Sequence, residues 1–552
     1  MLRTAGEESG VKVRDAFFEV LRSHGITTVF GNPGSNELPL LRDFPDDFRY
    51  VLALHEGAAI AMADGYALAT GRPSLVNLHA AAGTGNAMGN LTNTQSGHVP
   101  VVVTSGQQAR RYTALNALLT NVDATALAEP LVKWSCEPLR PEDVPQALSQ
   151  GILLAGSAPA GPVYLSLPLD DWDHQADPGA LKHLKARTVQ GDPVVSEPAL
   201  DLLRRRLTGA ANPVMVVGPG IDDATGWDGA CRLADRLALP VFVAPSPSRC
   251  PFPTRHPGYR GVLPSDIPAV ARHFDGHDLV VAFGAAIFRY FAFEEGDYLP
   301  PGTELWAVTS DPDEATRAPF GRILVGNPSD ALARLTETVP ARHRPPPPPL
   351  ERTSRLNEAG PAFSAEAIVD ALDAAKDEST VLAHEWTSVL TTWDRFDISR
   401  PGSLYFPASG GLGWGLPAAI GLQLGDPSRR VLAMLGDGAL HYTVSALWTA
   451  ARYRVPVVFV VARNGEYGAL KKFTQAMQAP GVPGLELPGI DITGIASAYG
   501  ISATRIDTLD ALTAAVTAAL ATDEPHLIEV PQQPLTASGS TENLYFQSGA
   551  LE

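Results

Sequence analysis

The sequence predicts an α/β protein made of three doubly wound, parallel-sheet domains, and three observations support this. The chain has 552 residues, which is too long for one hydrophobic core, since a domain usually holds roughly 150 residues. Short apolar runs alternate with Ala- and Leu-rich amphipathic stretches, a pattern typical of parallel sheets covered by helices. Five consecutive prolines, Pro345 to Pro349, end the second series of runs and favour an extended spacer.

The strand candidates are twelve apolar runs, four in each predicted domain. They occupy residues 27–31, 74–80, 99–106, 161–168, 212–220, 239–245, 278–284, 304–311, 379–385, 429–438, 455–465 and 525–531. We predict an N-terminal domain at 11–190, a central α/β domain at 195–345 and a C-terminal domain at 360–535. Residues 537–552 have the sequence of an expression tag with a protease site and are left out of the prediction.

The composition is that of a globular enzyme, with 45% hydrophobic and 18% charged residues. The formal net charge of −18 repels phosphate backbones, and no apolar run approaches the roughly 18 residues of a membrane span. Three cysteines without CxxC spacing indicate a reducing compartment. Because the N-terminal region shows no apolar signal segment, we expect a cytoplasmic protein that binds neither nucleic acid nor membrane.

Two polar strand ends predict a metal and phosphate site in the C-terminal domain. Gly436-Asp437-Gly438 follows one apolar run directly, and Arg463-Asn464-Gly465 follows the next. The carboxyl ends of parallel strands face one crevice, where ligands of open α/β sheets bind. Carboxylate and amide oxygens suit Mg²⁺, and glycines let backbone N–H groups approach a diphosphate. A lone GDG is more often a tight turn, so it is the pairing with Asn464 that favours a metal site.

A second group of polar residues lies in the N-terminal domain. It comprises the segment 31–37 (GNPGSNE), Glu56 after an apolar run, and His79 followed by Asn86. Glu56 precedes a helix of small residues that must pack closely, and its carboxylate either caps that helix or is held at a perturbed pKa for chemistry. His79 is single in an apolar strand, where a histidine is more often a hydrogen-bonded core residue than a functional one.

Motifs in all three domains carry a resemblance to a known family. They include GNPGSNELP, NLHAAAGTGNAMGN, GPVYLSLPLDDWD, RCPFPTRHP, GLPAAIG and SALWTAA. In these motifs the chain resembles the benzoylformate decarboxylase family of thiamine-diphosphate-dependent 2-oxo acid decarboxylases. The resemblance implies three domains of the thiamine-diphosphate enzyme type, with thiamine diphosphate and Mg²⁺ as cofactors. It also implies decarboxylation of an aromatic 2-oxo acid, benzoylformate to benzaldehyde and CO₂, through a thiamine ylide.

The resemblance implies a role for each matching residue. Glu56 would hydrogen-bond the aminopyrimidine ring of the cofactor, His79 would act as acid and base, and Ser35 would bind the substrate carboxylate. Asp437, Asn464 and the backbone carbonyl of Glu466 would hold the metal. The positions that match cofactor contacts are Asn32, Gly34, Asn86, Thr387, Ser388, Gly410, Leu412, Gly436, Gly438, Ala439, Tyr467 and Gly468. Those that match the substrate pocket are Leu118, Leu119, Phe291, Phe406, Ala469 and Phe473.

Two positions depart from the family pattern. Arg463 stands where the family has the first residue of a terminal Asn pair. Phe291 stands where the family has a second active-site histidine, so the proton that releases the aldehyde must come from His79 or from water. Losing a positioned acid costs roughly 10²–10⁴-fold in the step that it serves, which makes carboligation with a second aldehyde a candidate side activity.

Two other functions stay open from the sequence. One is a thiamine-dependent carboligase similar to benzaldehyde lyase or acetolactate synthase, and the other is a catalytically silent thiamine-binding protein. The joint presence of Glu56, Asp437 and Asn464 disfavours the second. In this family the pyrimidine and diphosphate motifs meet across a subunit interface. The resemblance therefore implies a homo-oligomer, a tetramer built as a dimer of dimers, acting on a small 2-oxo acid and an aldehyde.

Overall fold

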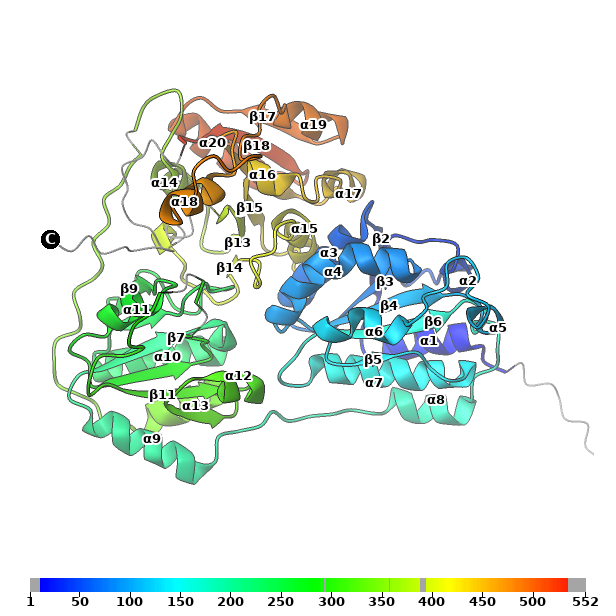
Figure 1. Ribbon diagram of the computed structural model, residues 1–552, viewed down its shortest axis with the longest axis horizontal. Helices are drawn as coiled ribbons and strands as arrows, with labels where there is room; N and C mark the ends of the chain where they lie inside the picture. The colour runs from blue at the N-terminus through cyan, green and yellow to red at the C-terminus, as the bar shows by residue number, and fades with distance from the viewer. Residues whose placement is uncertain (1–9, 289, 292–293, 357, 388–393, 535–552) are drawn as a thin grey trace, which may run out of the picture. The chain divides into compact units, whose positions relative to one another are not determined.

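The computed structural model describes residues 10–288, 290–291, 294–356, 358–387 and 394–534 (Figure 1). The chain forms two compact units. Unit 1 comprises Met1–Gly191, Ser409–Pro427 and Tyr442–Val455, and unit 2 comprises Asp192–Ala408, Ser428–His441 and Pro456–Glu552. Unit 1 holds one of three six-stranded parallel sheets, and unit 2 holds the other two.

The first sheet has the strand order β2-β1-β3-β4-β6-β5. Its strands are β1 (Thr28–Gly31), β2 (Arg49–Leu52), β3 (Ser74–Leu78), β4 (Val101–Gln107), β5 (Ser135–Cys136) and β6 (Val163–Pro168). The helices around it are α1 (Val13–Ser23), α2 (Leu38–Leu41), α3 (Glu56–Thr70), α4 (Ala80–Ser96), α5 (Arg110–Thr113), α6 (Ala124–Ala128), α7 (Val144–Gly156) and α8 (Pro178–Lys185). Phe17 of α1, Leu148 of α7 and Leu165 of β6 share one core, because α1 and α7 bury their apolar faces against this sheet.

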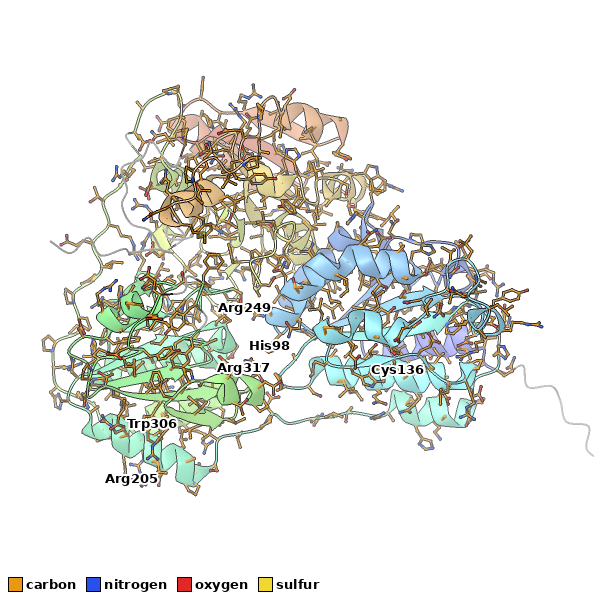
Figure 2. All side chains as sticks on the ribbon, viewed as in Figure 1. His98, Cys136, Arg205, Arg249, Trp306 and Arg317 are labelled. Carbon is orange, nitrogen blue, oxygen red and sulfur yellow. The ribbon has the colours of Figure 1, made fainter. Side chains whose placement is uncertain are left out.

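The second sheet has the strand order β12-β11-β10-β7-β8-β9. Its strands are β7 (Pro213–Val217), β8 (Val241–Val243), β9 (Tyr259–Val262), β10 (Leu279–Phe283), β11 (Glu304–Thr309) and β12 (Arg322–Val325). Its helices are α9 (Glu197–Gly209), α10 (Ala224–Leu237), α11 (Ile267–His273), α12 (Pro312–Arg317) and α13 (Pro328–Thr338). At one edge, Arg322 of β12 places its guanidinium 5.2 Å from the ring centre of Trp306, its register partner on β11. Trp306 is labelled in Figure 2. This cation–π contact joins the edge strand to its neighbour β11.

The third sheet has the strand order β14-β13-β15-β16-β18-β17. Its strands are β13 (Val381–Glu385), β14 (Leu404–Tyr405), β15 (Val431–Gly436), β16 (Val457–Arg463), β17 (Ser502–Arg505) and β18 (His526–Pro531). The helices in this part of the chain are α14 (Ala365–Ala375), α15 (Gly415–Gly425), α16 (Asp437–Leu440), α17 (Ala446–Tyr453), α18 (Gly468–Ala476), α19 (Ile492–Ala498) and α20 (Leu509–Leu520). Numbered from its own first strand, this sheet repeats the order of the first sheet.

The predicted fold class is confirmed, since all the sheets are parallel and helices alternate with strands along the chain. Each of the twelve predicted runs contains a strand. Six strands were missed, and each of them lies at an edge of its sheet: β2, β5, β9, β12, β14 and β17. None of the helices in the described part of the chain combines the length and apolar character that a membrane crossing needs.

Helices α3 and α15 pack at very close range within unit 1, as the small residues of α3 predict. A Cβ on Gly65 of α3 would lie 2.2 Å from the carbonyl oxygen of Ala418, and one on Gly421 of α15 would lie 2.0 Å from that of Met62. Such distances leave no room for any side chain larger than hydrogen. The two glycines therefore fix the approach of α15 to the helix that begins at Glu56.

Candidate active site

Strand order alone marks one crevice in the first sheet. The chain runs from β1 outward to β2 and then returns to the other side of β1 with β3, so the strand order reverses between β1 and β3. In open parallel sheets, ligands bind beyond the carboxyl ends of the strands at this switch point. Asn32 and Ser35 follow β1, and His79 follows β3. Three predicted site residues therefore gather at the position that the topology favours.

Glu56 is the first residue of α3 and is not its cap. The cap is His55, whose Nδ1 accepts a hydrogen bond from the backbone N–H of Gly57 at 3.1 Å. Of the two roles left open by the sequence, capping is therefore wrong. The Glu56 carboxylate is 7% exposed, and it accepts hydrogen bonds from the side-chain amides of Asn86 (3.0 Å) and Asn32 (3.4 Å). Both of these partners were predicted to belong to the site.

His79 is bound to Glu37, a residue to which the sequence assigned no role. The Nδ1 of His79 lies 2.9 Å from Oε2 of Glu37, whose carboxylate is buried and also accepts from the backbone N–H groups of Gly34 and Gly106, both at 2.9 Å. A Cβ on Gly34 would stand 2.0 Å from the imidazole, so this glycine makes room for the pair. Ala80, which follows His79 in the chain, has a φ of +40°, a strained conformation often found at functional sites.

The alternative of a core histidine does not describe His79, because 22% of its side chain is exposed. With Nδ1 donating to the Glu37 carboxylate, the neutral imidazole has Nε2 as its acceptor. The only sequence signal for Glu37 was its acidic side chain within GNPGSNE. Ser35 is exposed, and its hydroxyl donates to Oδ1 of Asn36 at 3.3 Å.

The loop that carries Gly410 and Leu412 lies against α4 in unit 1. Asn93 of α4 donates to the carbonyl of Gly411 at 2.9 Å, and Asn90 donates to the carbonyls of Gly413 (3.0 Å) and Gly57 (2.8 Å). A single amide thus links this loop to the first turn of α3, next to Glu56. The structure therefore brings Gly410 and Leu412 to the same part of unit 1 as the N-terminal site residues.

Asp437 lies at the corresponding switch point of the third sheet, between β13 and β15, in unit 2. It is 5% exposed, and its two oxygens accept from the backbone N–H groups of Gly465 (2.7 Å) and Gly438 (2.9 Å). Burial raises the pKa of Asp437 above its ordinary value, and these backbone hydrogen bonds oppose that shift. The bond from Gly465 brings the ends of β15 and β16 together, as the paired motifs predict.

The rest of the predicted metal loop carries oxygen atoms of the kind that bind Mg²⁺. Oδ1 of Asn464 accepts from the backbone N–H of Glu466 at 3.1 Å, which turns the loop tightly after β16. Arg463, the departure from the family pattern, is bound to the buried carboxylate of Glu529 on β18 at 2.6 Å. Its side chain therefore has a structural partner on the neighbouring strand. One carboxylate, one amide oxygen and a loop carbonyl form an all-oxygen set, which fits Mg²⁺.

The predicted cofactor positions of unit 2 lie at the ends of its strands and at the starts of its helices. A Cβ on Gly438 would stand 2.7 Å from the Tyr467 ring, so the glycine of the GDG motif is in contact with that tyrosine. Gly436 ends β15, Ala439 lies in α16, and Gly468 begins α18. Thr387 follows the end of β13. Ser388 lies outside the described residues.

The predicted pocket residues divide between the two units. In unit 2, the ring centres of Phe291 and Phe473 are 5.0 Å apart with planes inclined by 35°. Phe406 lies 5.6 Å from the ring of His384 on β13, and Ala469 lies in α18. Leu118 and Leu119 belong to unit 1, where Leu118 is 86% exposed. Phe291 and Phe473 are therefore the one pair of predicted pocket residues in ring contact within the described chain.

Comparisons with known proteins agree with these features. Models of the thiamine pyrophosphate enzyme family match the chain over its N-terminal TPP binding domain (residues 11–127), central domain (200–335) and C-terminal TPP binding domain (387–530). The chain is 52% identical to the benzoylformate decarboxylase of Pseudomonas aeruginosa, over 95% of the chain and 99% of that protein. A probable 2-ketoarginine decarboxylase of the same organism is 29% identical over 90% of both.

Two solved structures are also similar to the chain. The thiamine diphosphate-dependent 4-hydroxybenzoylformate decarboxylase of Rhodococcus jostii superposes with a TM-score of 0.92 at 46% identity, covering 95% of the chain and 99% of that structure. The benzoylformate decarboxylase of Polynucleobacter necessarius superposes with a TM-score of 0.90 at 38% identity, with the same coverage.

Proposed function

The chain belongs to the thiamine-diphosphate-dependent enzymes of the benzoylformate decarboxylase type, and we propose that it decarboxylates an aromatic 2-oxo acid with Glu56, His79 and Ser35 as its catalytic residues. The observation that carries this assignment is a pair of buried carboxylates in one domain. Glu56 is held by Asn32 and Asn86, and Glu37 is held against His79. A carboxylate and an imidazole with separate partners suit two separate proton transfers.

Glu56 serves the cofactor in this proposal. Each of its oxygens accepts one amide hydrogen bond and keeps lone-pair capacity for another, so the carboxylate is able to hydrogen-bond an aminopyrimidine ring. Asp437, Asn464 and the carbonyl of Glu466 are the proposed Mg²⁺ ligands, all of them oxygen donors. When bound, thiamine diphosphate supplies the electron sink that lets CO₂ leave a 2-oxo acid.

His79 and Ser35 serve the substrate. The exposed hydroxyl of Ser35 orients the carboxylate that will leave as CO₂. His79 exchanges protons through Nε2, since its Nδ1 is bound to Glu37. Glu37 keeps the imidazole in one tautomer and one orientation. Glu37 is thus a positioning residue that acts through His79.

Carboligation is a second candidate function, and the contact between Phe291 and Phe473 favours it. Phe291 is 58% exposed and lies on the ring of Phe473, so this part of unit 2 presents aromatic surface in place of a proton donor. Once CO₂ has left, protonation releases an aldehyde, whereas attack on a second aldehyde gives a 2-hydroxy ketone. Aromatic side chains stack well on an aryl aldehyde and do not protonate the product.

We further propose a homotetrameric, cytoplasmic enzyme with the domain ranges 11–190, 195–345 and 360–535. The strands of each sheet all fall within one of these ranges, which supports them. Leu115, Leu118 and Val122 of unit 1 are 72%, 86% and 76% exposed, and an apolar segment of this kind is suited to burial against another subunit. All three cysteines are free thiols, as in a reducing compartment.

One assay tests the proposed reaction. CO₂ release is measured from a panel of aryl and aliphatic 2-oxo acids after chelation and dialysis, with and without added thiamine diphosphate and Mg²⁺. We expect activity to be highest on aryl substrates and to return only when both cofactors are added. Full activity in a preparation shown to lack thiamine would refute the proposal.

Subunit exchange tests the shared site. Glu56→Gln and Asp437→Ala chains, each inactive alone, are mixed under conditions in which exchange is demonstrated by mass. If the site combines Glu56 of one chain with Asp437 of another, some mixed sites are intact and activity returns in part. Failure to recover activity despite proven exchange would mean that each site is built from a single chain.

A further inference from the structure

The proposed metal loop is paired with a second segment of unit 2. The backbone N–H of Tyr467 donates to the carbonyl of Leu485 at 2.9 Å, and that of Leu487 donates to the carbonyl of Gly465 at 2.8 Å. Between these two bonds, Glu466 and Glu486 form an antiparallel bridge. The residue whose carbonyl is a proposed metal ligand is therefore held by a short ladder to the segment 485–487.

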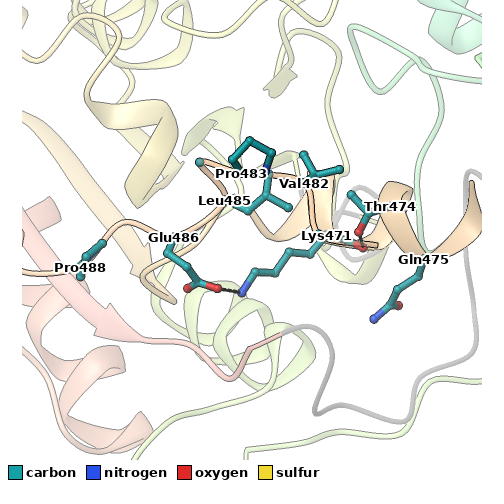
Figure 3. Close-up of a pocket in the computed structure, with 10 residues that line it drawn as sticks. Lys471, Thr474, Gln475, Val482, Pro483, Leu485, Glu486 and Pro488 are labelled. Carbon is teal, nitrogen blue, oxygen red and sulfur yellow. Dashed lines mark hydrogen bonds and ion pairs between the residues drawn. The ribbon is translucent and has the colours of Figure 1, made fainter. Parts of the chain in front are cut away.

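Lys471 joins the same two segments through its side chain. It lies in α18, the helix that follows the loop, and its ammonium group contacts the carboxylates of both Glu466 and Glu486. Figure 3 shows the contact with Glu486. The Glu466 side chain is 5% exposed, and its other oxygen, Oε1, has no hydrogen-bond partner among the described residues. A buried carboxylate depends on its counter-ion, and Lys471 is the cation that the structure places there.

The residues that lead into the segment 485–487 are open to solvent. A cavity of about 650 Å³ lies beside them, and Lys471, Leu485, Glu486 and residues 481–484 are part of its lining (Figure 3). Residues 481–484 are exposed, so apolar packing contributes little there. An exposed ion pair between two surface residues is usually worth little, but here one of the partners, Glu466, is buried and belongs to the metal loop itself.

We propose that Lys471 is a positioning residue for the metal site, holding the loop of Asn464 to Glu466 in its ligating form by bridging Glu466 to Glu486. This inference rests on the proposed metal ligands. Because the N–H of Glu466 is bound to the Asn464 amide and the N–H of Gly465 to Asp437, a shift of Glu466 moves all three ligands together. This bridge from Lys471 to Glu466 and Glu486, here called the Lys471 clamp, therefore acts on metal affinity and does not contact the substrate.

The test uses calorimetry to measure the Mg²⁺ dissociation constant of the intact oligomer at saturating thiamine diphosphate. Lys471→Met should weaken Mg²⁺ binding roughly 10- to 100-fold, the usual effect of removing a group that supports metal ligands, and kcat at saturating Mg²⁺ should stay within about threefold. Lys471→Arg should restore most of the affinity. The matched control is Lys472→Met, because the neighbouring Lys472 takes no part in the ion pairs with Glu466 and Glu486.

Several outcomes would overturn the clamp. They are Mg²⁺ affinity within twofold of the parent in a folded Lys471→Met protein, an equal loss in Lys472→Met, or no recovery with Lys471→Arg. Should Lys471→Met not fold, Glu486→Gln removes the exposed end of the bridge, and unchanged affinity in that variant counts against the clamp equally. Asp437→Ala must abolish Mg²⁺ binding. Normal binding there would overturn the metal site itself, and this inference with it.

Discussion

The first and third sheets have the same strand order, yet the same crevice carries different chemistry in each. In the first sheet, the end of β1 presents Asn32, whose amide binds the Glu56 carboxylate, and the end of β3 presents His79, which suits proton transfer. In the third, the ends of β13 and β15 present Thr387 and Asp437, which suit a metal and a phosphate. Strand order therefore decides where polar residues gather, and the residues themselves decide which reaction they serve.

The two crevices also hold their carboxylates differently. Asp437 is held by backbone N–H groups from two loops, whereas Glu56 is held by the side-chain amides of Asn32 and Asn86. Backbone donors survive most substitutions, but side-chain donors do not. We expect the metal site to respond to loop position and the Glu56 site to respond to single side-chain changes.

Removal of Asp437 should have the largest effect. The Asp437→Ala variant loses the only carboxylate of the proposed metal set, so we expect cofactor binding to fail and activity to fall about 10³-fold or more, the equivalent of several kcal/mol of metal stabilisation. Equilibrium dialysis with thiamine diphosphate and Mg²⁺ measures binding directly. If the variant still binds thiamine diphosphate and Mg²⁺ but has lost activity, Asp437 takes part in the reaction itself. The two crevices would then not differ in the way proposed.

Glu56→Gln should separate binding from catalysis. The amide keeps the size of the side chain and removes its charge, so kcat should fall roughly 10²–10⁴-fold, the range for a positioned acid or base, while the affinity for thiamine diphosphate stays within about tenfold. Steady-state kinetics and calorimetry on the same preparation measure both quantities. A variant that lost cofactor affinity and kept kcat would show that Glu56 only binds.

Glu37→Gln should have a smaller effect because Glu37 acts through His79. An amide nitrogen placed near Gly34 and His79 removes an acceptor from both, so the imidazole loses its orientation. We expect kcat to fall about 10- to 100-fold, less than for a residue that transfers the proton itself. Glu37→Asp, which keeps the charge, is the matched control. A His79→Ala, Glu37→Gln double variant no slower than His79→Ala alone would confirm that both residues serve one function.

Phe291→His should alter the products more than the rate. A histidine returns a proton donor beside Phe473, and a change of only 1.4 kcal/mol between two barriers shifts their partition about tenfold. The ratio of benzaldehyde to hydroxy ketone, formed from benzoylformate with excess acetaldehyde, should therefore rise. Phe291→Leu keeps the site apolar and serves as the control. An unchanged ratio in the histidine variant would leave Phe291 with a packing role only.

The smallest effect should appear in the pH dependence of stability. Burial lowers the pKa of His384 to about 4, below its ordinary value of 6.5, and neither ring nitrogen has a partner in the described part of the chain. Unfolding therefore takes up a proton below pH 6.5, and stability is lost as pH falls from 6.5 toward 4, by roughly 2 kcal/mol at pH 5. His384→Leu should show a smaller fall in Tm between pH 7 and pH 5, measured by scanning calorimetry. An equal fall in both proteins would contradict this assignment.

The interior strands could be predicted from the sequence, and the edge strands could not. The predicted runs became interior strands such as β15 and β16, which helices cover on both faces, so nearly every position is apolar. The missed strands have mixed or very short sequences. β17 has three exposed or half-exposed residues around Ala503, and β14 has only two residues. An edge strand forms because it pairs with a single neighbouring strand, and the residues of the edge strand alone do not reveal that pairing.

The candidate site divides in the same way. The sequence by itself determined that Glu56, His79 and Asp437 follow apolar runs, because hydrophobicity is a property that each residue carries into any fold. Only the tertiary structure decided that Glu37 holds His79, that His55 caps α3 and that Arg463 binds Glu529. Glu37 and His79 are 42 positions apart, and Arg463 and Glu529 are 66 apart. Hydrogen bonds over such separations exist only after the sheet has brought the strand ends together, since they depend on distances that no local pattern of residues encodes.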